Sequence, residues 1–135
     1  MTSATYRIDA KQRHVAVKFP KKVNVAVIES YCNALRNNPI FSPNFSEIVD
    51  ITEVEEIELA PDEMIRIADQ VDPFAAEARR AFIVRTSVQN QNARMHKALR
   101  ISKNLEVFRS QKEALAWIQS ASGASAVRAI GKAAK

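Results

Sequence analysis

A run of four apolar residues, Ala81 to Val84, lies between Arg80 and Arg85. The run is too short for a helix and has no polar residue on either face, so it predicts a strand that is covered on both sides. A sheet buried on both faces needs helices packed above and below it. We therefore expect an α/β protein in which residues 80–85 form the central strand.

The other segments with strand-like patterns alternate apolar and polar residues. Tyr6 and Ile8 belong to one such segment and Val15 to Phe19 to a second, so the two predict a hairpin joined across residues 10–13. Residues 47–51 and 105–108 predict two further strands. Together with residues 80–85, these segments predict a sheet of five strands.

Two segments between these strands have apolar residues at helical spacing. The first helix is predicted to begin after the capping residue Asn24 and to end at residues 37–39. The second is predicted to begin at Pro61, which the first helical turn tolerates, and to end at residues 72–73. The apolar stripes are Val25, Ile28, Cys32 and Leu35 in the first helix and Met64, Ile67, Ala68 and Val71 in the second.

Two more helices are predicted in the last third of the chain. From residue 88 onward one arc of a helical wheel is apolar and the other is basic, so this third helix is expected to bury its apolar arc. The fourth helix begins with a capping box, Ser110 to Glu113, and Gly123 is its expected end. The arcs of the third helix comprise Val88, Met95, Ala98 and Leu99 on the apolar side and Arg94, Lys97, Arg100 and Lys103 on the basic side.

The order of these elements predicts the topology. Strands separated by single helices pair in parallel through right-handed crossovers, whereas the hairpin strands pair antiparallel. We expect a mixed five-stranded sheet with four helices, formed by residues 1–122 as one domain and followed by a basic tail, residues 123–135. No apolar run approaches the roughly 20 residues that a membrane span needs. The N-terminal residues also lack a signal-peptide pattern, so a cytoplasmic location is expected.

Charge is distributed unevenly along the chain, although the net charge is only +5. Residues 1–28 hold six basic residues and one acidic residue. Residues 29–77 hold two basic and twelve acidic residues, and residues 78–135 hold twelve basic and two acidic residues. Such blocks predict a dipolar surface that steers a charged protein partner or favours self-association as a homodimer. They do not predict a specific nucleic-acid site.

The residue inventory argues against familiar catalytic and cofactor sites. The only glycines are Gly123 and Gly131, so no glycine-rich loop is present to hold a nucleotide phosphate. The only histidines, His14 and His96, belong to no spaced set with other metal-binding residues, so neither a metal nor another cofactor is expected. Cys32 lies on an apolar stripe and is expected to be a buried, unreactive thiol.

Three further residue groups are expected to be structural. His96 lies among basic residues and is expected to be exposed. Trp117 lies on the fourth helix and is expected to be a packing or rim residue rather than a stacking platform for nucleic acid. The acidic run from Glu53 to Glu58 lacks the pattern of a calcium loop and is expected to be a solvated loop.

Two segments, IVDITEVEEIELAPDEM and LEVFRSQKEALAWI, resemble the SpoIIAA-like branch of the STAS superfamily, also called STAS/SEC14-like proteins. The resemblance spans about residues 5 to 120. Residues 107–118 resemble the closing strand and helix of the family. Residues 50–52 resemble the end of the family's central acidic strand, and residues 93–95 resemble its third-helix signature.

The resemblance implies a site at the start of the second helix. In STAS proteins that antagonise anti-sigma factors, a Ser or Thr followed by Gly opens this helix and is phosphorylated by a partner kinase. Here the corresponding stretch, residues 58–61, has no acceptor hydroxyl. The resemblance therefore does not extend to phosphorylation, although a helix terminus still offers unpaired N–H groups to an anion or a partner side chain.

These observations leave several functions open. The first is a non-enzymatic interaction or regulatory module that binds a protein partner or itself at the edge around the second and third helices. The alternative is a protein that binds a small apolar or lipid-like ligand in the crevice beyond the carboxyl ends of the strands. An enzyme that uses Asp50, Ser87 and Arg94 is a third hypothesis, but helices packed closely on the sheet are expected to leave no room for a reactive centre. The candidate binding residues are Asp50, Thr52, Glu58, Leu59, Ala60, Pro61, Ser87, Asn90 and Arg94.

Overall fold

The structure is a computed structural model in which residues 2–120 are described. The expected end of the fourth helix at Gly123, the domain boundary at residue 122 and the tail at residues 123–135 lie outside the described residues. No helix among residues 2–120 is both long enough and apolar enough to cross a membrane.

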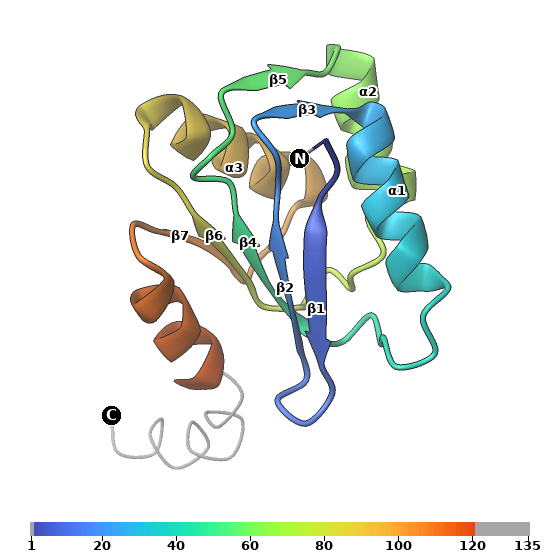
Figure 1. Cartoon of the computed structure of the whole chain (residues 1–135), viewed down its shortest axis with the longest axis vertical. Coiled ribbons are helices and arrows are strands. Elements are labelled where there is room, and N and C mark those ends of the chain that lie inside the picture. Colours follow the sequence, from blue (N-terminus) through green and yellow to red (C-terminus); the bar gives the residue numbers. More distant parts are fainter. Residues whose placement is uncertain (1, 121–135) are drawn as a thin grey trace.

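The main sheet has five strands in the order β1-β2-β4-β6-β7 (Figure 1). β1 and β2 form the predicted antiparallel hairpin, and the remaining neighbours pair in parallel. This confirms the mixed five-stranded sheet. The strands are β1 (Thr5–Asp9), β2 (His14–Lys18), β4 (Ser46–Asp50), β6 (Arg80–Ile83) and β7 (Leu105–Phe108).

The middle strand of the sheet is β4, so the prediction that residues 80–85 form the central strand was wrong. Both β4 and β6 have inner residues buried on both faces, and burial therefore does not distinguish them. The hairpin occupies one edge and β7 the other, and each crossover adds its strand on the same side. β4 is the third of these five strands in chain order, and it consequently lies in the middle of the sheet.

Two short strands form a separate parallel pair that the sequence pattern did not predict. β3 (Lys22–Asn24) pairs with β5 (Glu56–Glu58), and both lie at the top of Figure 1. The second half of the acidic run is therefore a strand and not a loop. Its outer residues, Glu56 and Glu58, are exposed, whereas Ile57 is half-buried opposite the buried Val23.

Three helical segments cover one face of the sheet, because right-handed crossovers between strands added in one direction place their helices on the same side. Asn24 caps α1 as predicted, with its Oδ1 accepting a hydrogen bond from the N–H of Val27 at 3.0 Å. Pro61 begins α2, also as predicted, but the helix then widens into a π-helix. The segments are α1 (Val25–Arg36), α2 (Pro61–Arg66) with the π-helix η1 (Ile67–Val71), and α3 (Ser87–Arg100).

The fourth helical segment, residues 111–120, covers the opposite face (Figure 1). Its Ala114 and Ile118 pack against apolar side chains of β4 and β6. Ser110 caps it as predicted, because its Oγ accepts a hydrogen bond from the N–H of Glu113 at 3.2 Å. Trp117 packs against Phe108, which confirms its expected structural role.

The orientation of α3 differs from the prediction. Val88 is 63% exposed and Met95 48% exposed, whereas Gln89 and Ala93 are buried. The small side chain of Ala93 faces the core on α3, and the Gln89 side chain is held by hydrogen bonds to the neighbouring loops. A hydropathy pattern cannot reveal that a glutamine is fully bonded inside the protein.

Candidate functional site

A buried ion pair joins Glu47, the second residue of β4, to Arg80, the first residue of β6. Side chains alternate along a strand, so Glu47 on β4 and Arg80 on β6 both face the helices α1, η1 and α3, and the parallel register places them side by side. The Arg80 Nε and Nη2 atoms donate to the Glu47 Oε1 atom at 2.9 and 2.6 Å. Only 5% of the Arg80 side chain and 2% of the Glu47 side chain are exposed.

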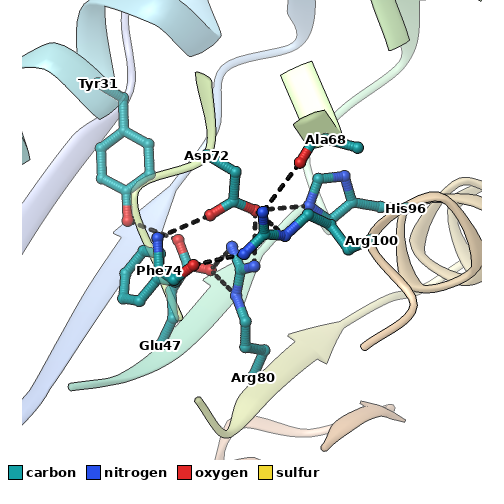
Figure 2. Close-up of polar contacts among 8 residues, drawn as sticks. All are labelled: Tyr31, Glu47, Ala68, Asp72, Phe74, Arg80, His96 and Arg100. Atoms are coloured by element: carbon teal, nitrogen blue, oxygen red, sulfur yellow. Dashed lines mark hydrogen bonds and ion pairs between the residues drawn. The ribbon is translucent and has the colours of Figure 1, made fainter. Parts of the chain in front are cut away.

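Asp72, at the end of η1, extends this pair into a network (Figure 2). Its Oδ2 atom accepts hydrogen bonds from Arg80 Nη1 at 2.6 Å and from His96 Nε2 at 2.8 Å, and Arg100 Nε lies 3.6 Å away. The expectation that His96 is a surface residue was therefore wrong. Its side chain is only 20% exposed because α3 is rotated toward the core at this position.

Tyr31 and Phe74 complete the surroundings of this network. The Tyr31 hydroxyl on α1 donates to Glu47 Oε2 at 2.6 Å, and the Arg80 guanidinium lies over the Phe74 ring at 4.6 Å from its centre. Arg100 donates to the backbone carbonyls of Ala68 and Phe74. We call Tyr31, Glu47, Asp72, Arg80, His96 and Arg100 the polar cluster.

Burial and neighbouring charges shift the pKa values of Asp72, Arg80 and Tyr31 in the polar cluster. Burial opposes ionisation of Asp72, but the charge of Arg80 and the hydrogen bond and charge of His96 outweigh it and hold the pKa of Asp72 well below its usual value. Burial likewise opposes the charge of Arg80, yet Glu47 and Asp72 raise the pKa of Arg80. Burial, and then the Glu47 charge, raise the pKa of Tyr31.

Cys32 lies next to Tyr31 and is buried, as predicted. Burial, and then the charges of Asp72 and Glu47, raise the pKa of its thiol to about 12. The thiol is therefore protonated and a poor nucleophile near neutral pH.

A cavity of about 130 Å³ extends from the polar cluster between the sheet and the helices α1, η1 and α3. Its walls are mainly apolar, and the small side chains of Cys32 and Ala93 leave part of this space open. The helices were expected to leave no room for a reactive centre, and as regards space this prediction was wrong. Sequence periodicity shows which residues face inward but not whether they fill the space. The apolar walls include Phe19, Val23, Ile28, Val49, Ile51, Ile67, Phe74, Phe82 and Leu99.

A wider groove of about 530 Å³ lies at the carboxyl ends of the strands. It is bordered by the loop after β4, by β5, and by the first turns of α2 and α3. Residues that line both the groove and the cavity form their shared wall, namely Val54, Ile57, Leu59, Met64 and Asn92. The groove therefore adjoins the cavity.

The predicted binding residues lie around this end of the molecule, but they do not converge on one point. Leu59 is the one member of the set that lines the cavity and the groove. Asp50 Oδ1 accepts hydrogen bonds from the N–H and hydroxyl of Thr52 at 2.9 and 2.6 Å. Asn90 Oδ1 accepts from Arg94 Nε at 3.1 Å.

The other predicted residues lie at element ends. Glu58 pairs with Lys22 at 3.4 Å on the surface, and Ser87 is the exposed first residue of α3. Ala60 is the N-cap of α2 and Pro61 is its first residue, and the Ala60 N–H donates to Glu63 Oε1 at 2.8 Å.

The polar cluster was not predicted from the sequence. Two signals were present, because Glu47 and Arg80 each begin a segment with a buried-strand pattern and carry opposite charges. Nothing local linked Asp72 to His96, which are 24 residues apart. Within residues 2–120 no group of three or more His, Cys, Asp or Glu side chains is arranged to hold a metal ion.

Comparison with known proteins identifies the fold of this chain. No family model matches the chain, and no curated protein matches it. The chain is similar to the crystal structure of an uncharacterised DUF3478-family protein with a SpoIIAA-like fold from Shewanella loihica PV-4. The TM-score is 0.63 at 20% sequence identity, over 87% of this chain and 95% of that chain. In its fold, this chain is a SpoIIAA-like α/β domain.

Proposed function

We propose that the chain is a non-enzymatic regulatory module that binds a small apolar ligand in the cavity. The cavity beside the polar cluster is the observation that carries this proposal. Ligand sites are typically concave and largely apolar, with a few polar groups at defined positions. The cavity and the adjoining groove have this character.

The size of the cavity limits the ligand. A dry apolar cavity of roughly 150 Å³ in another protein binds benzene or xenon. A space of about 130 Å³ therefore suits one small ring or a short alkyl chain.

The bonding within the polar cluster favours binding over catalysis. Asp72 is ionised and bonded to Arg80 and His96, so it is a weak general base. The Cys32 thiol is protonated near neutral pH. These groups hold each other in place and offer a bound molecule little reactivity.

Binding of benzene and toluene to the full chain tests the proposal. A ligand at ten times its Kd stabilises the folded state by about 1.4 kcal/mol, which corresponds to a rise in Tm of roughly 4–7 °C for a domain of this size. Ala93→Leu fills the cavity and is expected to abolish this rise. Differential scanning calorimetry measures both effects.

Ala114→Leu is the matched control, because Ala114 is an equally buried helical alanine on the opposite face of the sheet. This variant is expected to be less stable but to keep the ligand-induced rise in Tm. The proposal fails if neither compound raises the Tm of the wild-type chain, or if Ala93→Leu binds as well as the wild type.

A protein partner or a second copy of the chain is the second candidate, and the exposed face of α3 favours it. Val88 and Met95 are exposed on this helix, and Ile65 is exposed on the neighbouring α2. Exposed apolar side chains mark an interaction surface when they lie together in one patch. Light scattering of the wild type and of the double variant Val88→Ser with Met95→Ser tests self-association. A wild-type chain that is monomeric at high concentration contradicts the homodimer.

A further inference from the structure

Asn92 lies in the wall that separates the groove from the cavity. It is half-buried on α3, and it lines both spaces together with four apolar residues. It is the one polar residue shared by the two linings. A molecule that enters the cavity from the groove therefore passes this side chain.

The Asn92 side chain has no hydrogen-bond partner among residues 2–120, whereas several other polar side chains of α3 are bonded. Gln89 bonds to the loop after β4, Asn90 to Arg94, and His96 to Asp72. An amide offers two donors and one accepting oxygen, and a half-buried amide beside apolar side chains is stabilised when these are used. Because Asn92 is only half-buried, its amide is free to bond water or a molecule that lies in the groove.

We infer that the ligand is amphipathic, with its apolar group in the cavity and a neutral hydrogen-bonding group beside Asn92. This inference rests on the proposed function. A hydroxyl, amide or ester group suits the site because an amide both donates and accepts hydrogen bonds. A charged group suits it poorly, because the polar cluster already pairs its own charges and an unpaired ion is costly to bury.

Toluene and benzyl alcohol form a matched ligand pair, since both have one ring and only the second has a neutral polar group. Isothermal titration calorimetry on the full chain gives the Kd of each for the wild type and for Asn92→Leu. The substitution is expected to weaken benzyl alcohol binding by about five- to tenfold, through loss of one hydrogen bond, and to change toluene binding by less than about twofold.

Gln91→Leu is the matched control, because Gln91 is an amide residue of the same helix that lines neither space and, like Asn92, has no side-chain hydrogen-bond partner among residues 2–120. It is expected to leave both affinities unchanged. The inference is overturned if Asn92→Leu leaves benzyl alcohol binding unchanged or weakens both compounds equally, and the proposed function then still stands. If neither compound binds the wild-type chain, both the proposed function and this inference fall.

Discussion

At Ile101, which caps the C-terminus of α3, the backbone adopts a left-handed conformation with φ 53° and ψ 41°. The Ser102 N–H donates to the Lys97 carbonyl at 3.0 Å, so the turn closes the helix in the usual way. Glycine is favoured at this position, because a β-branched residue is strained at positive φ. Ile101 is also 77% exposed, so its side chain contributes little to the core.

Replacing Ile101 with Gly is therefore expected to stabilise the fold by about 1 kcal/mol, because the strain is relieved and little buried area is lost. Urea unfolding monitored by circular dichroism measures the change. Ile40→Gly is the control, since Ile40 is also exposed but has no positive φ, and it is expected to bring no gain. An Ile101→Gly variant no more stable than the wild type would contradict this account.

Among the elements, α3 is positioned by one buried glutamine. Gln89 Oε1 accepts hydrogen bonds from the N–H groups of Arg85 and Thr86 at 2.6 and 3.2 Å, and Gln89 Nε2 donates to the carbonyls of Thr52 and Val54 at 3.2 and 2.9 Å. The side chain thus ties the first turn of the helix to the loop that borders the groove. It also sets the rotation of α3 that directs Asn92 and His96 toward the cavity.

Gln89→Leu is expected to destabilise the protein by on the order of 3 kcal/mol, because four backbone groups lose their partner and some stay buried. The double variant Val88→Ser with Met95→Ser is expected to change the free energy of unfolding by less than about 0.5 kcal/mol, because both side chains are exposed. Chemical denaturation compares the two. A larger loss in the serine variant than in Gln89→Leu would show that the helix is oriented as its hydropathy suggests.

Over the whole molecule, the polar cluster joins α1, β4, η1, β6 and α3 through a single set of charges (Figure 2). The pKa of Asp72 is lower in the folded state than its ordinary value of 3.8. As the pH falls, the unfolded chain therefore takes up this proton first. The stabilisation by Asp72 is complete above the unfolded pKa and is lost as the pH falls through the folded pKa.

From this one group we expect a loss of about 2–3 kcal/mol of stability between pH 5 and pH 2. Asp72→Asn is expected to be less stable at pH 7, because Arg80 loses a partner, and to lose less stability over the acid range. Asp69→Asn, at an exposed acid of the same helical segment, should keep the acid dependence of the wild type. Urea unfolding at several pH values measures the three curves, and equal slopes for Asp72→Asn and the wild type would contradict the prediction.

Short-range patterns were enough to predict the five strands of the main sheet, the helices between them and their order. The caps at Asn24 and Ser110 and the helix start at Pro61 depend on residues within a few positions of one another, so they can be identified in the sequence. The alternation of strand and helix patterns likewise predicts the mixed sheet, since crossover handedness leaves few topologies. The SpoIIAA-like fold that the sequence resembles was confirmed by the similarity to a solved structure.

The cavity and the polar cluster were decided only in the tertiary structure. The pairs Glu47 with Arg80 and Asp72 with His96 join residues 33 and 24 positions apart, and their contact depends on strand register and on the rotation of α3. The π-helix η1 and the pairing of β5 with β3 likewise depend on neighbouring segments. An apolar pattern determines which side chains face inward, whereas the space left between them depends on how closely the helices approach the sheet.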